Sequence, residues 1–378
     1  MKKLILGAGM FLLSAVALQA QTCNGLDSII VERYYLSDLN DKSVDGTGGV
    51  LPLYSVTYRI YVDMKPGYKF QAAYGVDVVP TGVYTNPGDH ELRLQTSTMF
   101  FNNEDRGSTT PAFSKAQAAT NTNMIDSWIS VGAACNNQFG VLKSDDNGVA
   151  NAVNSNGVLL NTSPVIGLPL TTQDGFFAGA PEAVTMVGIS NDVLAFDAVA
   201  NGGTNGPLFS TYNGSWASLN GSLGPLPENR ILIAQITTDG TFSFKLNIQL
   251  GTPTGGGTEN WVASNPVAGE CTHPTLTFRD SLAAHTMAIN ALKKADMFNV
   301  YPNPANDVLT IDIAKASKSN DNSYTIYAID GKVMLTKKLG TISDRYQEKI
   351  DLSSFAPGLY FVEVISDGVK STKKITKN

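Results

Sequence analysis

One loop near the N-terminus gathers side-chain oxygens that could bind a cation. They stand at Asp38, Asn40, Asp41 and Asp45. Ca²⁺ takes several carboxylate and carbonyl oxygens and is abundant outside cells, but this spacing lacks the closing acid of an EF-hand loop. Two interpretations are open, a calcium site and a solvated turn, and the incomplete spacing favours the turn. We predict no other cofactor.

Motifs for catalysis are largely missing. The chain has no Gly-x-Ser-x-Gly elbow, His-Glu-x-x-His pair, Cys-x-x-Cys pair or phosphate-binding glycine loop after a strand. A Ser/His/Asp triad would have to use His90 or His273, and neither stands in a supporting local pattern. The enzymatic alternative is a carbohydrate hydrolase or lyase with two paired carboxylates. Its candidate acids are Glu91, Glu104, Asp105 and Glu182. We therefore assign no catalytic residue.

The three cysteines allow one disulfide in an oxidising compartment. Cys23 and Cys271 bracket most of the chain, and a bridge between them would stabilise the fold by on the order of 4 to 5 kcal/mol in the entropic model. Pairings through Cys135 stay open. A catalytic Cys135 would need a histidine partner, so the sequence favours a buried thiol there.

Aromatic residues on polar stretches are the candidates for ligand binding. Tyr212, Trp216 and Trp261 could stack on a sugar or protein partner if they are exposed, and the alternative is that they pack in the core. We expect Trp128 to be a core residue.

The first twenty residues have the pattern of a signal peptide. Met1-Lys2-Lys3 is basic, residues 4–17 are apolar or small, and we expect cleavage after Ala20 although Leu18 is not the small residue preferred there. The residues before Cys23 do not favour lipidation. No later stretch reaches eighteen consecutive apolar residues, so we predict no membrane-spanning helix in the mature chain.

Residues 21–278 show strand periodicity with frequent turns, and we predict one large antiparallel β-sandwich or jelly-roll-like domain. The expected strands include residues 27–35, 54–63, 70–74, 90–98 and 126–132, and residues 229–236 and 241–249 should form a hairpin around Asp239-Gly240. Residues 279–298 should be a linker that holds one short helix. Residues 297–378 carry 11 Lys and Arg against nine Asp and Glu, and the rest of the chain carries 16 against 24. This acidic balance argues against a nucleic-acid partner.

Residues 299–378 have a strand pattern of their own. Residues 308–313 alternate, and residues 324–329 and 332–335 flank an Asp330-Gly331 turn that predicts a hairpin. Pro357-Gly358 marks another corner before a strand that ends at Ile365. Six or seven short strands predict a small Ig-like β-sandwich.

Three motifs in this segment carry a family resemblance. They are Tyr301-Pro302-Asn303-Pro304, Asp330-Gly331 within residues 327–332, and Gly358-Leu359-Tyr360 ahead of several lysines. In this order they resemble the type A C-terminal sorting domain of the Bacteroidetes type IX, or Por, secretion system. The resemblance implies recognition by the outer-membrane type IX machinery and a secreted or outer-membrane surface location. Release and surface attachment stay open. We call residues 299–378 the tail and the domain before the linker the passenger.

The resemblance does not extend to the passenger. We expect a non-catalytic binding or adhesion module with a glycan or protein ligand. The alternatives are the paired-carboxylate hydrolase or lyase and a structural component of the cell surface or a biofilm.

Overall fold

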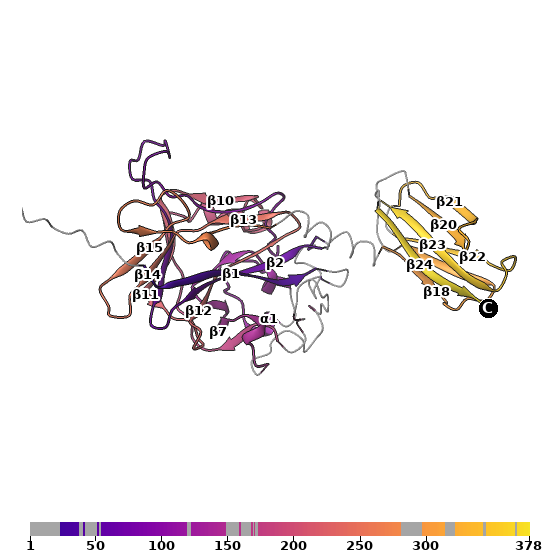
Figure 1. Cartoon of the computed structure of the whole chain (residues 1–378), viewed down its shortest axis with the longest axis horizontal. Helices are drawn as coiled ribbons and strands as arrows, with labels where there is room; N and C mark the ends of the chain where they lie inside the picture. The colour runs from indigo at the N-terminus through magenta and orange to yellow at the C-terminus, as the bar shows by residue number, and fades with distance from the viewer. Residues whose placement is uncertain are drawn as a thin grey trace, which may run out of the picture.

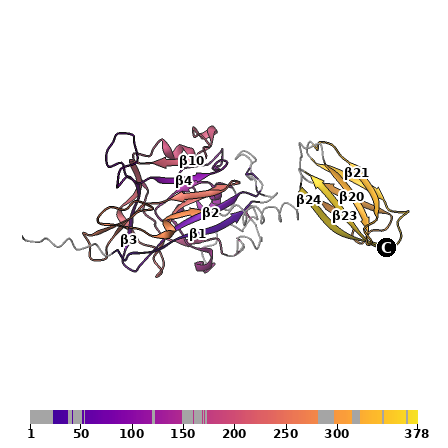
Figure 2. The same ribbon diagram turned by 45° about the horizontal axis from the view of Figure 1, so that its top comes forward.

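A computed structural model gives the structure of residues 23–37, 41, 51–52, 54–118, 122–148, 159, 168, 170, 173–280, 297–313, 322–342, 345–366 and 369–378. The predicted signal peptide and the predicted linker helix lie outside these described residues. Regular structure within them is nearly all β-strand, in several antiparallel sheets, as the periodicity predicts (Figures 1 and 2). The short helical segments are α1 (Lys115–Ala118), η1 (Thr122–Ile125), η2 (Lys143–Asp145), η4 (Asp192–Ala195), η5 (Val199–Asn201) and η6 (Pro274–Leu276).

The centre of the passenger is an antiparallel sheet whose middle strands are buried on both faces. Its order is β1 (Leu26–Leu36), β2 (Val56–Met64), β12 (Arg230–Thr238) and β5 (Trp128–Ile129). Along β2, Tyr58 and Ile60 are buried on one face, and Arg59 and Tyr61 are buried on the other. Both faces of this sheet must therefore be covered by other elements.

Two further sheets pack on the face that carries Ile60 and form the main sandwich core with it. The first has the order β10 (Leu208–Thr211), β4 (Leu92–Thr96), β13 (Phe242–Lys245) and β17 (Thr277–Arg279). The second has the order β16 (Glu270–Cys271), β15 (Thr258–Trp261), β14 (Ile248–Gly251), β3 (Lys69–Gly75), β11 (Gly214–Ser222) and β9 (Thr185–Val187). Leu94, Phe244 and Trp216 from these sheets join Ile60 in one hydrophobic cluster.

The opposite face of the central sheet carries a second cluster that includes Tyr34, Tyr61, Trp128 and Phe176. It lies under α1, η1 and a small sheet of β6 (Ala133–Cys135), β7 (Gln138–Gly140) and β8 (Phe176–Ala178). The Arg59 guanidinium is fully buried here, 3.5 Å from the centre of the Tyr34 ring.

The predicted hairpin around Asp239-Gly240 is wrong. Strand β12 pairs in the central sheet, whereas β13 pairs with β4 in the facing sheet, so the turn carries the chain from one layer of the sandwich to the other. The Thr238 hydroxyl lies 2.6 Å from that of Thr96 on the facing sheet and holds this crossing in place. An Asp-Gly turn can join two strands of one sheet or carry the chain from one sheet to the other. Here the burial of Phe242 between the layers favours the crossing.

The single strand predicted over residues 241–249 also divides. Strands β13 and β14 belong to different sheets, and Asn247 lies between them. Its side-chain amide donates to the carbonyl oxygens of Tyr74 at 2.9 Å and Glu91 at 3.1 Å, and its amide oxygen accepts from Ala263 N–H. These bonds satisfy backbone groups at the junction of the two sheets.

The tail is a sandwich of two small sheets. One has the order β18 (Asn299–Tyr301), β19 (Val308–Ile313) and β22 (Tyr346–Asp351), and the other has the order β21 (Val333–Lys338), β20 (Ser323–Ala328), β23 (Gly358–Ser366) and β24 (Val369–Lys377). Leu309, Ile326 and Val362 from the two sheets share one core. The predicted hairpin at Asp330-Gly331 is confirmed, since β20 and β21 pair in antiparallel register around it.

Candidate functional site

Most of the candidate calcium loop lies outside the described residues. Asp38, Asn40 and Asp45 belong to that part, and only Asp41 is described. The Asp41 carboxylate is buried and accepts a hydrogen bond of 2.5 Å from the Tyr35 hydroxyl. In the portion of the chain that the structure covers, no group of three His, Cys, Asp or Glu side chains could hold a metal ion.

The four candidate acids do not line one cleft. Glu104 lines a small hollow of about 160 Å³, and Glu182 lines a different one of about 520 Å³. Asp105 pairs with its neighbour Arg106 at 3.0 Å. Glu91 lies on a third surface, where it pairs with two cations. Neither of these hollows is lined by more than one of the four acids, whereas a glycosidase site needs two facing carboxylates.

The two candidate histidines contact a carboxylate and a threonine hydroxyl, and the Thr275 hydroxyl also accepts from Ile29 N–H at 2.7 Å. The His90 ring is buried, and its Nε2 atom lies 2.9 Å from Glu270 Oε2. The Nδ1 atom of His273 lies 2.8 Å from the Thr275 hydroxyl at the start of η6. Cys135 is buried in the second cluster, and burial raises the pKa of its thiol to about 12. A thiol with that pKa stays protonated and is a poor nucleophile.

The tryptophans proposed as ligand platforms are core residues. Trp216 is 0% exposed and packs edge-on against Phe209 with 5.8 Å between ring centres, and Trp261 is 5% exposed. Trp216 lies in a polar stretch of sequence, but its place on β11 points it into the sandwich. Of the two alternatives, packing in the core is therefore correct for both tryptophans, and Tyr212 is half-buried.

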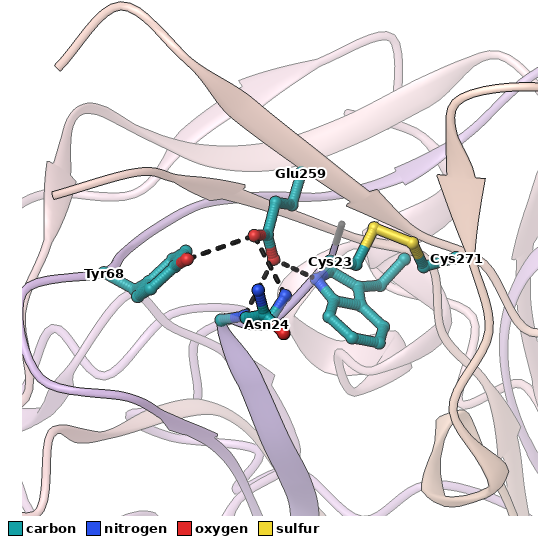
Figure 3. The surroundings of a disulfide bond; sticks show 7 residues. Cys23, Asn24, Tyr68, Glu259 and Cys271 are labelled. Carbon is teal, nitrogen blue, oxygen red and sulfur yellow. Dashed lines mark hydrogen bonds between the residues drawn. A yellow bond between two sulfur atoms is a disulfide. The ribbon is translucent and has the colours of Figure 1, made fainter. Parts of the chain in front are cut away.

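A disulfide and a buried carboxylate hold the N-terminal end of the passenger. Cys23 is bonded to Cys271 across 6.3 Å between their Cα atoms. Beside this bond the Glu259 carboxylate accepts hydrogen bonds from four donors (Figure 3). They are Asn24 N–H at 3.1 Å, Gly25 N–H at 2.8 Å, the Tyr68 hydroxyl at 3.2 Å and Trp261 Nε1–H at 3.0 Å. Four donors can compensate the burial of a charge that would otherwise be costly.

A basic surface lies on the outer face of the β10-β4-β13-β17 sheet. Each strand alternates, so that Leu94 and Phe244 point into the core while Arg93 and Lys245 point outward. Arg279 on β17 is exposed and has no ion-pair partner among the described residues. A hollow of about 520 Å³ lies over this surface, and we call it the basic face. It is lined by Arg93, Gln95, Ser243, Lys245, Thr277 and Arg279, among others.

The register of the strands makes the basic face electrostatically unusual. Lys245 lies directly opposite Arg93 on the neighbouring strand, a like-charge pairing that opposes folding. Glu91 partly offsets it, because Glu91 Oε2 lies 3.5 Å from Arg93 Nη1 and 3.3 Å from Lys245 Nζ. The hollow that Glu182 lines has a similar volume, yet no Lys or Arg lines it. Three cations, Arg93, Lys245 and Arg279, thus line one hollow of an acidic passenger.

Sequence reasoning missed the basic face. A signal exists, since the outward positions of three short alternating segments, at residues 92–96, 242–245 and 277–279, each include an Arg or a Lys. Nothing in the sequence shows that these segments are neighbours in one sheet.

The three tail motifs meet at one end of the small sandwich. Ala328, just before the Asp330-Gly331 turn, pairs with Tyr360, and Gly358 pairs with Lys377. The Asn303 side chain bonds the same end of β24, because its Nδ2 donates to Lys374 O at 2.9 Å and its Oδ1 accepts from Thr376 N–H at 3.0 Å. Motifs separated by about thirty residues in sequence therefore form a continuous surface.

Other motif residues have structural contacts at this end. The Tyr360 hydroxyl donates to Ala356 O at 2.8 Å, while Leu359 is half-buried. Tyr301 is exposed on β18 and its hydroxyl accepts from Gln347. Pro302 and Pro304 both follow cis peptide bonds.

Comparison with known proteins identifies this part of the chain. Residues 299–378 match the family described as the secretion system C-terminal sorting domain. No curated protein matches the chain. Among the residues that the structure describes, no helix has the length and apolar character needed to cross a bilayer. The tail is therefore a type IX secretion sorting domain, with the type IX machinery as its partner, and it directs the protein to the cell surface or the extracellular space.

Proposed function

We propose that the passenger is a non-catalytic binding module that holds an anionic ligand on its basic face. The observation that carries the proposal is the grouping of Arg93, Lys245 and Arg279 around one hollow. Like charges on adjacent strands oppose folding, and the single carboxylate of Glu91 offsets the repulsion between Lys245 and Arg93 only in part. A ligand that supplies negative charge would remove this repulsion on binding.

The export route complements this function. In our proposal the N-terminal leader takes the chain across the inner membrane, and the tail then takes it across the outer membrane. The passenger would reach a space where acidic polymers are available as ligands. Attachment of the cell to such a polymer would be an adhesive function.

Binding is favoured over hydrolysis by the arrangement of acids. A hydrolase of this kind needs two carboxyl groups about 5 to 10 Å apart across a cleft. Beside the basic face, Glu91 already pairs with Arg93 and Lys245, and no acid is among the residues that line the hollow. Release of reducing ends from a bound polysaccharide would overturn the non-catalytic assignment.

A charge-reversal experiment tests the proposal. The variant Arg93→Glu/Lys245→Glu/Arg279→Glu is compared with a control, Lys65→Glu/Lys69→Glu/Arg106→Glu, which changes net charge equally at other exposed positions. The probe is polygalacturonate, an acidic polymer, and the measurement is affinity at several salt concentrations. We expect the first variant to lose affinity by at least about tenfold relative to the control, with a weaker salt dependence. Equal affinity of the two variants would refute the proposal.

A further inference from the structure

A pair of stacked tyrosines lies beside the basic face. The rings of Tyr84 and Tyr212 are 3.8 Å apart between centres, with 4° between their planes. Tyr84 is 46% exposed, so one side of the stack is open to solvent. An exposed, flat aromatic surface of this kind can pack against the apolar face of a sugar ring.

The loop that carries Tyr84 is held in a fixed shape. It joins β3 to β4 and projects from the passenger (Figure 1). The buried Asp89 carboxylate accepts from Val78 N–H at 3.0 Å and from Asn86 N–H at 2.7 Å, and thereby ties both arms of the loop together. Below it, an isolated bridge pairs Val76 with His90. These bonds restrain both ends of the loop, and a restrained loop loses less conformational entropy when it binds a ligand.

The loop also exposes apolar side chains that folding would be expected to bury. Val78, Val79 and Val83 are each exposed by between 45% and 57%, next to the exposed Tyr84 ring. Grouped exposed apolar residues on a well-ordered loop are typical of an interaction site.

The stack and the basic face are continuous. In the β10–β4 pairing Thr211 lies opposite Leu92 and Ser210 lies opposite Arg93, and Tyr212 directly follows the end of β10. Glu91 is the residue that joins Arg93 to Lys245, and the Ser210 hydroxyl donates to it at 2.9 Å. Burial and the charge of Glu91 raise the pKa of Tyr212, as expected from this proximity.

We propose that the tyrosine stack and the basic face form one site for an acidic polysaccharide. A sugar ring packs on Tyr84, and acidic groups along the same chain pair with Arg93, Lys245 and Arg279. This inference rests on the proposed function and adds that the ligand is a chain of sugar rings, rather than an acidic protein. The tyrosine stack then binds sugar rings and the basic face binds acidic groups, and both recur along one polymer.

Four polymers separate the two requirements of the site. Polygalacturonate has sugar rings and carboxylates, and chondroitin sulfate has rings with sulfates as well. Polyglutamate has carboxylates without rings, and dextran has rings without acids. We expect polygalacturonate or chondroitin sulfate to bind at least about tenfold more tightly than polyglutamate. Comparison of the two polysaccharides then shows whether the site prefers carboxylates alone or a polymer that also carries sulfates. Dextran should not bind measurably.

Substitution of Tyr84 supplies the residue-level test. We expect Tyr84→Ala to weaken binding of the acidic polysaccharide about fivefold to tenfold and to leave polyglutamate binding unchanged. Tyr84→Phe keeps the ring and should bind as the wild type does, and Thr85→Ala, at an exposed polar position, is a control on the same loop. Retention of the Tyr84→Ala fold is checked by its unfolding midpoint.

The outcomes distinguish this inference from the proposed function. If polyglutamate binds as tightly as the polysaccharides and Tyr84→Ala has no effect, the polysaccharide inference is wrong, although the basic face still binds anions. If reversal of the three basic residues also has no effect, the proposed function fails as well.

Discussion

Replacement of Glu259 by Gln removes the charge from a carboxylate that is only 2% exposed and that accepts four hydrogen bonds. An amide can replace only one of the two oxygens. If its NH₂ group takes the Oε1 position, the Tyr68 hydroxyl can turn to accept from it, but Asn24 N–H loses its acceptor. The opposite orientation would orphan Gly25 N–H and Trp261 Nε1–H, which are both buried. The first orientation is therefore the less costly one.

We expect Glu259→Gln to lower the free energy of unfolding by about 2 kcal/mol, from one orphaned donor and the loss of charge assistance in the remaining bonds. All three tryptophans lie in the passenger, so urea unfolding followed by tryptophan fluorescence reports on this domain and not on the tail. Glu104→Gln, at an exposed carboxylate, is the control and should change stability by less than about 0.5 kcal/mol.

A double-mutant cycle with the disulfide sharpens this test. The entropic model assigns on the order of 5 kcal/mol to a bridge that spans so much of the chain. Without the bond, in Cys23→Ser/Cys271→Ser, the segment at Asn24 should fray and leave Glu259 without two of its donors. The effect of Glu259→Gln should then shrink. Equal stability of Glu259→Gln and the wild type in the oxidised protein would show that the carboxylate does not anchor this segment.

Three further predictions follow from other contacts. Burial lowers the pKa of Lys143 to about 8, so between about pH 8 and 10 the unfolded chain binds more protons than the folded one. Wild-type stability should therefore rise relative to Lys143→Met by about 2 kcal/mol from pH 7 to 10, and a flat difference in urea titrations would contradict this. Glu91→Gln frees Arg93 and Lys245 and should raise affinity for polygalacturonate about threefold, whereas a loss would mean that Glu91 orients these cations. Asn303→Ala removes two bonds to β24, and we expect it to cost the tail about 1 to 2 kcal/mol and to reduce the protein found at the surface, with Asn306→Ala as the neighbouring control.

Alternation and turn residues predict several of the individual strands, although the strand expected over residues 241–249 divides in two. The hairpin at Asp330-Gly331 follows from local chemistry, because a short loop with positive φ at Gly331 returns the chain from β20 to β21. The same type of signal fails at Asp239-Gly240. There the strands bury their apolar faces against each other from opposite layers, and no local signal distinguishes this from pairing within a sheet.

The candidate site was less predictable than the fold for a related reason. Alternation indicates that Arg93 and Lys245 point away from the core, but their adjacency depends on the pairing of strands about 150 residues apart. Trp216 shows the converse case. Its polar neighbours suggest an exposed loop, and only the position of β11 in the second sheet makes it a core residue.

The contacts at the end of the passenger argue that its site and its export signal are physically separate. The Asp280 carboxylate is buried and accepts from Arg33 Nη2–H at 2.6 Å and from the Tyr58 hydroxyl at 2.7 Å. These bonds fix the chain directly after Arg279, so the last strand of the basic face is anchored within the passenger. Met297 begins the separate core of the tail. Changes to the basic face should therefore alter binding and leave export intact, and changes to the tail motifs should do the reverse.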